Sequence, residues 1–297
     1  MTTLVTDEGN NAGQNSRTGA AFPAAAPPLK GTPGRRTLKN FLATALMPVG
    51  STLYVYGGGW NRGDTGAGPD ACAIGLSPLW GDFFRSQTAS YHYKRPGPAE
   101  SGGFFRGQNE YGRDGLDCSG YVGWTLYNTM NTASGGAGFV TKSTDMAKAL
   151  AERGWGTSSV SFRAEEFRPG DIFSMNGHVW ICLGRCGDGS LVILHSAPGE
   201  SRTGGKGGGP QLGAVGPSRK CEACRLAERY MSRYFPEWSR RYPAALQSYE
   251  AYTAISGGAS GLFHWDFSGA AGGLTDPEGY RDLGAERILA DLFRKNQ

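Results

Sequence analysis

The chain has 297 residues, of which 39% are hydrophobic, so it can bury a real core in one large domain or two small ones. Its 30 Lys and Arg residues against 26 Asp and Glu residues give a net charge of +4, a mild excess that does not call for a nucleic-acid partner. No apolar run approaches the roughly 20 residues of a membrane-spanning helix, and the polar, acidic start is unlike a signal peptide.

The start of the chain lacks the side chains from which a core is made. Residues 1–35 are rich in Gly, Ala, Pro, Thr and Asn, a composition that cannot offset the entropy cost of ordering. We therefore expect a disordered leader over residues 1–35 and a single domain over residues 36–297. Apolar residues along one helical face predict a helix at residues 37–47, which the sequence Pro-Val-Gly ends.

A short aromatic segment that ends in glycines follows, Tyr54-Val55-Tyr56-Gly57-Gly58-Gly59-Trp60. After it, residues 61–115 show no clean period and contain several prolines and many aromatic side chains. Loops of this length are usually functional or disordered, and the aromatic content argues against disorder. We expect a first ordered insertion at about residues 61–115, packed near the functional site.

The segment Asp117-Cys118-Ser119-Gly120-Tyr121-Val122 opens a run in which Val122, Leu126 and Met130 recur at a spacing of four. This spacing predicts a helix with Cys118 at its N-terminus. The positive end of a helix favours the thiolate, the form that attacks carbonyl groups. Cys118 is therefore a candidate nucleophile; the alternative is a cysteine that packs as a small apolar side chain.

A second helix is predicted over residues 146–153, and three strands follow it. The strands, at residues 172–174, 178–184 and 191–196, are separated by glycine-containing turns that are typical of hairpins, so they predict an antiparallel meander.

Side-chain alternation brings two histidines of this meander together. His178, Trp180 and Cys182 share one face of the second strand, and His195 lies on the third strand with Ile193 and Leu191. Paired strands lie about 4.8 Å apart, so the two imidazole rings can form a hydrogen bond. His178 is the candidate base for Cys118 and His195 the candidate orienting group; the alternative is a pair of satisfied core histidines.

The rest of the chain is rich in glycine and then in tyrosine. Residues 199–216 contain eight glycines and resemble a flexible linker. Helices are predicted at residues 221–235, 236–253 and 284–293, with a strand at residues 262–267. We interpret residues 199–261 as a second insertion.

Six cysteines lie at positions 72, 118, 182, 186, 221 and 224. With Cys118 reserved for catalysis, five remain, an odd number that cannot pair completely within the chain. Cys182, Cys186, Cys221 and Cys224 could hold a structural zinc ion, form a local disulfide or stay free, and free thiols are the prediction. We expect neither a metal nor another cofactor.

Four motifs together resemble the NlpC-type cysteine peptidases, papain-like endopeptidases that cut the stem peptides of bacterial peptidoglycan. They are D-C-S-G-Y-V at the start of a helix, P-G-D-I-F before a hairpin, G-H-V-W-I-C-L-G, and L-H-S. The resemblance covers residues 54–196 with one long interruption. It implies an α+β, papain-like fold in which a Cys-bearing helix packs on a small antiparallel sheet, with two large insertions.

The resemblance also implies roles for single residues. Cys118 corresponds to the nucleophile of that family, His178 to the general base that later acts as an acid, and His195 to the orienting residue. The hydroxyl of Tyr54 and the backbone N–H of Cys118 would bind the oxyanion.

Asp117 and Ser119 resemble the residues that recognise the amino end of the stem peptide. The implied substrate is peptidoglycan or a muropeptide, cut between D-glutamate and the diamino acid. Both insertions depart from the family's pattern and would shape the substrate cleft.

Two other functions stay open at this point: another thiol amidase or acyltransferase on the same scaffold, and a cell-wall binding module without catalysis. The intact Cys, His, His set favours catalysis. The resemblance places the protein outside the cell or in the wall, although no signal peptide is visible and the cytoplasm stays an alternative. The sequence does not indicate an oligomeric state.

Overall fold

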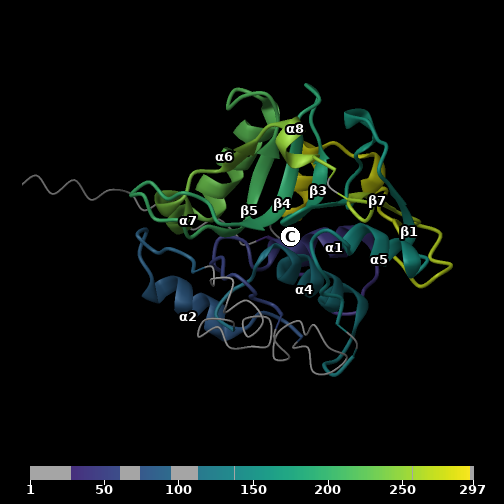
Figure 1. The fold of residues 1–297 in the computed structure, drawn as a ribbon, viewed down its shortest axis with the longest axis horizontal. Helices are drawn as coiled ribbons and strands as arrows, with labels where there is room; N and C mark the ends of the chain where they lie inside the picture. The colour runs from purple at the N-terminus through teal and green to yellow at the C-terminus, as the bar shows by residue number, and fades with distance from the viewer. Residues whose placement is uncertain (1–27, 61–73, 95–112, 137, 256, 295–297) are drawn as a thin grey trace, which may run out of the picture.

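The computed structural model describes residues 28–60, 74–94, 113–136, 138–255 and 257–294 (Figure 1). Most of the predicted leader and most of the first predicted insertion lie outside these ranges. The described residues form a mixed α+β fold around one sheet, as predicted.

The sheet has seven strands in the order β1-β7-β2-β3-β4-β5-β6. They are β1 (Gly156–Ser159), β2 (Ile172–Met175), β3 (His178–Arg185), β4 (Leu191–Ala197), β5 (Gly209–Val215), β6 (Ala245–Gln247) and β7 (Gly261–Trp265). All neighbours are antiparallel except β5 and β6, which are parallel. The expected small antiparallel sheet is therefore wrong in size and in type, because segments beyond the meander extend it on both sides.

The central meander of β2, β3 and β4 confirms the three predicted strands. Met175 pairs with His178, so the turn between β2 and β3 has only two residues, Asn176 and Gly177. Gly177 has φ +78°, a backbone conformation that glycine adopts without strain. This tight turn places His178 at the first position of β3.

Strand β5 lies where the flexible linker was predicted. All seven of its residues are buried, and it pairs with β4 along its whole length. Gly209 has φ +144°, and a Cβ atom there would lie 2.2 Å from the carbonyl oxygen of Thr52. These glycines allow close backbone packing, which is why a composition typical of linkers forms a buried strand.

Helices cover one face of the sheet. The helix α4 (Cys118–Met130) is buried along its whole length and packs against β3, β4 and α1 (Leu38–Leu46) (Figure 1). α6 (Glu222–Tyr234) packs on β5 and β4, α9 (Ala285–Leu292) on β3, and α5 (Met146–Glu152) on β1, β2 and β7. The apolar side chains of Val179, Ile181 and Leu194 face this layer.

Aromatic side chains cover the other face of the sheet. A second cluster joins Trp180, Cys182 and Ile193 to Phe167, with Tyr249 and Tyr252 at its margin. Its cover comes from two short helices, η2 (Ala164–Glu166) and α8 (Tyr249–Tyr252), and from the segments beside them. The predicted alternation of β3 and β4 is thus confirmed.

The helix predicted over residues 236–253 is wrong. α7 (Pro236–Arg241) ends where Pro243 begins to restrict the chain, since the residue before a proline avoids helical angles. Tyr242 is extended, with φ −124° and ψ 130°, and the chain continues into β6 and α8.

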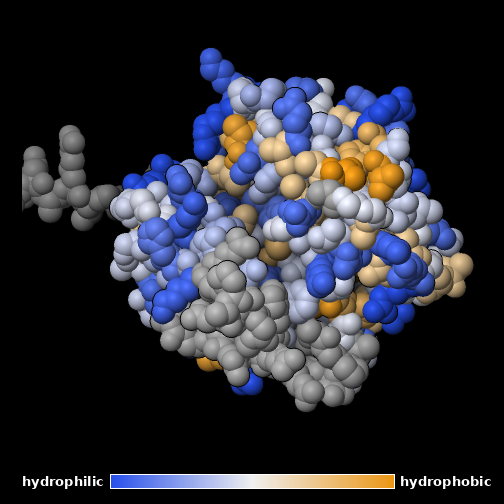
Figure 2. Space-filling model, in the orientation of Figure 1, coloured by the Kyte–Doolittle hydropathy of each residue, from blue (hydrophilic) through white to orange (hydrophobic). Residues whose placement is uncertain are grey.

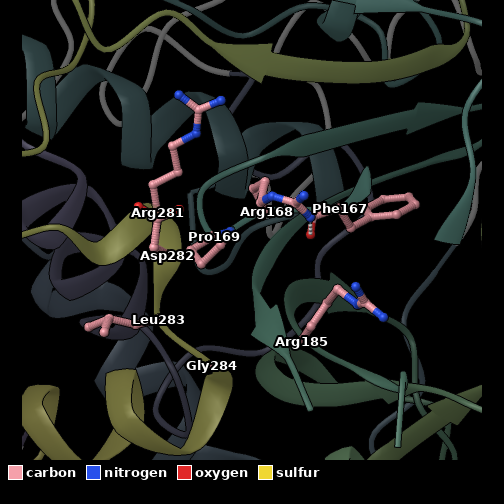
Figure 3. A pocket seen from close by; sticks show the side chains of 8 residues that line it. All are labelled: Phe167, Arg168, Pro169, Arg185, Arg281, Asp282, Leu283 and Gly284. Atoms are coloured by element: carbon pink, nitrogen blue, oxygen red, sulfur yellow. Dashed lines mark hydrogen bonds between the residues drawn. The ribbon is translucent and has the colours of Figure 1, made fainter. Parts of the chain in front are cut away.

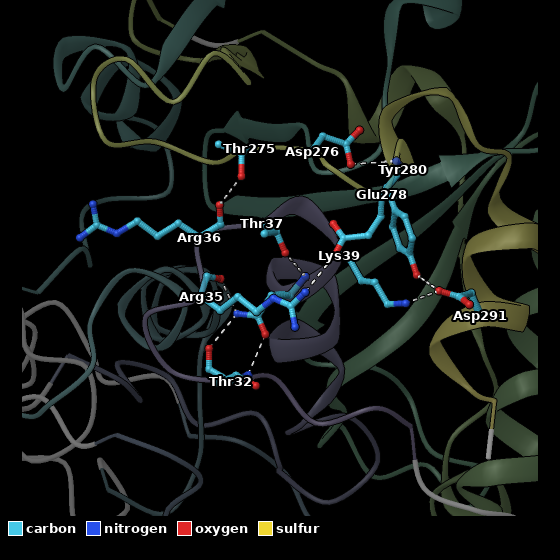
Figure 4. Close-up of polar contacts among 11 residues, drawn as sticks. Thr32, Arg35, Arg36, Thr37, Lys39, Thr275, Asp276, Glu278, Tyr280 and Asp291 are labelled. Carbon is cyan, nitrogen blue, oxygen red and sulfur yellow. Dashed lines mark hydrogen bonds and ion pairs between the residues drawn. The ribbon is translucent and has the colours of Figure 1, made fainter. Parts of the chain in front are cut away.

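The two ends of the described chain are tied together (Figure 4). Lys39 of α1 forms an ion pair of 2.7 Å with Asp291 of α9, and Tyr280 of η3 (Tyr280–Asp282) hydrogen-bonds the same carboxylate. Arg35 pairs with Glu278 at 3.1 Å.

The surface carries no broad apolar face in the view of Figure 2, where apolar residues form small separate patches. The exposed large apolar side chains of the described residues are Leu76, Leu79, Val160 and Ile255. Leu79 lies in α2 (Pro78–Ser86), and Leu76 lies just before it. None of the described helices is both long and apolar enough to cross a bilayer.

Candidate active site

Cys118 is the first residue of α4, with Asp117 as its N-cap. The carboxylate of Asp117 accepts a hydrogen bond from the Gly120 N–H at 2.7 Å, which fixes the start of the helix. The sulfur of Cys118 contacts the backbone on both sides of His178: it lies 3.9 Å from the carbonyl oxygen of Gly177 and accepts the N–H of Val179. The thiol-bearing residue is 6% exposed.

The two predicted histidines meet. Nε2 of His178 lies 3.3 Å from Nδ1 of His195, and the rings are nearly perpendicular, at 79°. His178 is partly exposed, whereas His195 is fully buried on β4. The Cys118 sulfur therefore lies against the backbone beside His178, and the ring of His178 lies against the ring of His195.

Burial dominates the electrostatics of this group. Burial raises the pKa of the Cys118 thiol to about 12, and the charge of Asp117 adds to the rise. Burial lowers the pKa of His178 to about 4, and burial together with His178 holds the pKa of His195 well below its usual value. The backbone N–H groups at the start of α4 do favour the thiolate, as expected, but burial outweighs them. The resting pair is thus a neutral thiol and a neutral imidazole.

Tyr54 lies beside the thiol. Its backbone is held by the Tyr54 N–H bond to Gly208 O at 2.9 Å and by the Tyr91 hydroxyl, which donates to Tyr54 O at 3.1 Å. Burial and the nearby Cys118 and Asp117 raise the pKa of the Tyr54 hydroxyl far above its usual value. The hydroxyl therefore stays protonated and remains a hydrogen-bond donor.

Asp117 and Ser119 are bound internally. Asp117 also accepts the N–H of Gly57 at 3.1 Å, and Ser119 donates to Asp117 at 3.0 Å and accepts the indole N–H of Trp60 at 2.9 Å. Burial raises the pKa of Asp117 to about 6, against these hydrogen bonds, which lower it. The two side chains join the aromatic segment to α4, and their recognition of a substrate stays a prediction.

Tyr252 is a member of this group that sequence reasoning missed. Its hydroxyl lies 3.3 Å from Nδ1 of His195, and its ring centroid lies 5.1 Å from that of His178. Its carbonyl oxygen accepts the indole N–H of Trp180 at 3.0 Å, which anchors α8 to the sheet. The abundance of tyrosines in this region was visible in the sequence, but no spacing singled out residue 252.

The remaining described cysteines, Cys182, Cys186, Cys221 and Cys224, are free in this structure. In the described ranges no three His, Cys, Asp or Glu side chains gather as metal ligands would. Cys72 lies outside these ranges.

A hollow of about 340 Å³ lies at the opposite end of β3 (Figure 3). Arg185, the last residue of β3, lines it together with Arg168 and Arg281, whereas His178 is the first residue of β3. Arg168 and Arg185 both donate to the carbonyl oxygen of Glu165, and Arg281 extends away from them. This hollow is separate from the Cys118 site.

No family model, no curated protein and no solved structure matches this chain.

Proposed function

We propose that this protein is a papain-like cysteine peptidase that hydrolyses peptidoglycan stem peptides, with Cys118, His178 and His195 as its triad. The observation that carries the proposal is the contact of the Cys118 sulfur with the backbone on both sides of His178, whose ring lies within hydrogen-bond distance of His195. Nucleophile, base and orienting group thus come from a helix start and two adjacent strands. The motif resemblance supports the substrate class and the bond between D-glutamate and the diamino acid.

The reaction begins from neutral groups. The thiol gives its proton to His178 as the sulfur attacks the scissile carbonyl carbon, and His195 accepts the Nε2–H of the imidazolium that forms. The Tyr54 hydroxyl and the Cys118 N–H donate hydrogen bonds to the oxyanion of the tetrahedral intermediate.

Collapse of that intermediate breaks the C–N bond. His178 returns its proton to the leaving amine, and a thioester with Cys118 remains. Water, deprotonated by His178, then attacks the thioester and releases the acid and the free thiol. His178 thus carries two protons in turn: it passes the thiol proton to the leaving amine, and later returns a proton of the attacking water to the sulfur.

A thiol acyltransferase is the second candidate, and the cover of the site favours it. Cys118 is only 6% exposed, and Tyr252 lies against both histidines. A thioester shielded from water would survive until an amine acceptor arrives, so the same residues would join peptides instead of cutting them.

The test uses purified stem peptides and mass spectrometry. We expect the wild-type chain to release the amine-side fragment, Cys118→Ala to release none, and Cys224→Ser, which changes a free cysteine outside the site, to match the wild type. Iodoacetamide labelling of Cys118 without cleavage, but with product formed from an added amine, would favour the acyltransferase. Absence of both reactions would leave a cell-wall binding module.

The proposed site of action follows from the substrate. Stem peptides occur in the intact bacterial wall and in the soluble fragments that wall turnover releases. We propose that the protein acts on one of these two substrates. Digestion of intact sacculi beside soluble muropeptides distinguishes them.

A further inference from the structure

The proposed mechanism requires one particular tautomer of His195, the orienting residue of the triad. Nε2 of His178 faces Nδ1 of His195 at 3.3 Å, so Nδ1 of His178 is the nitrogen left to receive the thiol proton. In its neutral form His178 then carries hydrogen on Nε2 and donates it to His195. Because Nδ1 of His195 is the acceptor, its neutral ring must carry hydrogen on Nε2.

That Nε2 atom is buried. Within the part of the chain that the structure describes, it has no hydrogen-bond partner. It lies above Gly213 of β5, where a Cβ atom would be only 3.0 Å away. A buried N–H without an acceptor costs free energy, so the tautomer that catalysis needs requires a partner on this side of the ring.

Gln211 offers the complementary atom. It is the residue of β5 directly opposite His195 in the sheet register, and it is 1% exposed. Its Oε1 is also buried and has no partner among the described residues. Side chains directly opposite on neighbouring antiparallel strands have Cβ atoms about 4.5–5.5 Å apart, within reach of a glutamine amide or of one bridging water.

We infer that Gln211 is a positioning residue whose Oε1 accepts the Nε2–H of His195, directly or through one buried water, and so holds His195 in the tautomer that orients His178. The inference rests on the proposed function and adds a fourth residue behind the triad. In the proposed reaction the order of the groups becomes Gln211, His195, His178 and then the Cys118 thiol. Gly213 leaves the room that the His195 ring occupies.

The test compares Gln211→Met, which has a similar length but no amide oxygen, with the wild type. Nitrogen-15 NMR of the imidazole rings reports which nitrogen of His195 carries the proton. We expect Nε2–H in the wild type and a mixture of tautomers in Gln211→Met. With stem peptide, kcat falls about tenfold, which corresponds to about 1.4 kcal/mol, while KM stays within about twofold.

Two further variants separate positioning from folding. Gln247→Met changes a half-buried glutamine of the neighbouring strand β6 and should match the wild type in tautomer and in kcat. Gln211→Glu keeps an acceptor oxygen, so it should keep the Nε2–H tautomer and move the acid limb of the pH–rate profile to higher pH, because a nearby carboxylate favours the imidazolium.

The outcomes are distinguishable from those of the proposed function. An Nδ1–H tautomer of His195 in the wild type, or an unchanged tautomer in Gln211→Met, overturns the inference whatever the enzyme does to stem peptides. The expected tautomer change in a protein that cleaves no stem peptide supports the relay and refutes the substrate assignment.

Discussion

At the scale of single residues, burial decides the protonation of the candidate site. The same surroundings that hold the Cys118 sulfur against β3 raise the pKa of its thiol to about 12 and lower the pKa of His178 to about 4. A helix N-terminus favours a thiolate, but the removal of water from both groups acts more strongly. In the proposed reaction, proton transfer therefore accompanies the attack of the sulfur and does not precede it.

The Asp117 side chain gives a direct test of these charges. Asparagine is an equally good N-cap, so Asp117→Asn should keep α4 while removing the second-largest cause of the raised Cys118 pKa. We expect the midpoint of the iodoacetamide reaction rate against pH to move to lower pH. Asp114→Asn serves as the control, because this nearby acid is not among the main causes of the raised thiol pKa. An unmoved midpoint in Asp117→Asn would contradict the assignment.

His264 gives stability a pH dependence. Its Nδ1 lies 2.9 Å from the buried carboxylate of Asp171, and this hydrogen bond raises the His264 pKa above 6.5. A group whose pKa is raised on folding stabilises fully below its unfolded pKa and loses that effect as pH rises through its folded pKa. The free energy of unfolding, measured in urea, should therefore fall as pH rises above 6.5. His264→Asn should flatten this pH dependence. An unchanged pH dependence in the variant would refute the stabilising role of the His264–Asp171 contact.

At the scale of elements, the short helix α8 closes the site. Its Tyr252 touches both imidazoles, and its backbone is anchored to β3 through Trp180. Four helical residues carry little stability of their own, so the sheet holds this cover in place.

Removal of the Tyr252 side chain should return the pKa values of Cys118 and His178 toward their usual values. In Tyr252→Ala, water reaches the pair, so the Cys118 pKa falls and the His178 pKa rises, each toward its usual value. The rate of iodoacetamide labelling at pH 8 should increase, and proton NMR of His178 should show a higher midpoint. Tyr249→Ala, on the same helix but packed on Phe167, is the matched control, and equal labelling rates in the two variants would argue against a cover at residue 252.

Strand β5 depends on glycines that accept close backbone contact. Gly209→Ala adds a Cβ atom 2.2 Å from Thr52 O at φ +144°, so we expect the free energy of unfolding to fall by more than about 1 kcal/mol. Gly199→Ala, where the nearest atom would be 3.7 Å away, should change it by less than about 0.5 kcal/mol. Urea titration measures both, and equal values would mean that residue 209 is not tightly packed.

At the scale of the whole molecule, the two ends of the described chain lie side by side. α1 supports α4, which carries Cys118, and α9 packs on β3, which carries His178. The contacts of Lys39 and Tyr280 with Asp291 join α1 to α9 (Figure 4). The ends of the described chain thus support the elements that carry Cys118 and His178.

Asp291 should matter more than its neighbour on the same helix. Asp291→Ala removes a partly buried carboxylate and with it the contacts to Lys39, Tyr280 and Arg294, so we expect a loss of about 1 kcal/mol in the free energy of unfolding. Glu286→Ala removes only an exposed ion pair with Arg229 and should cost less than about 0.5 kcal/mol. Thermal and urea unfolding of the two variants check the order, and a larger effect at Glu286 would reverse this assignment.

Local patterns in the sequence were enough to predict the meander, the helix that begins at Cys118 and the shared face of His178 and His195. Hairpin turns, apolar spacing and side-chain alternation act between residues close in the chain, and they were all legible there. The contact between the two imidazoles followed from them, because the strands that carry these residues are consecutive.

Three features depended on contacts between distant segments, and only the tertiary structure decided them. Glycines 209 and 213 form a buried strand because a neighbouring strand and residues 52–54 cover them, whereas their composition alone is typical of a linker. Tyr252 reaches His195 across 57 residues, and Gln211 faces it only through the register of β5. Burial, which sets the pKa values of Cys118 and His178, is likewise a property of the assembled fold, because water is removed only when all its layers have packed together.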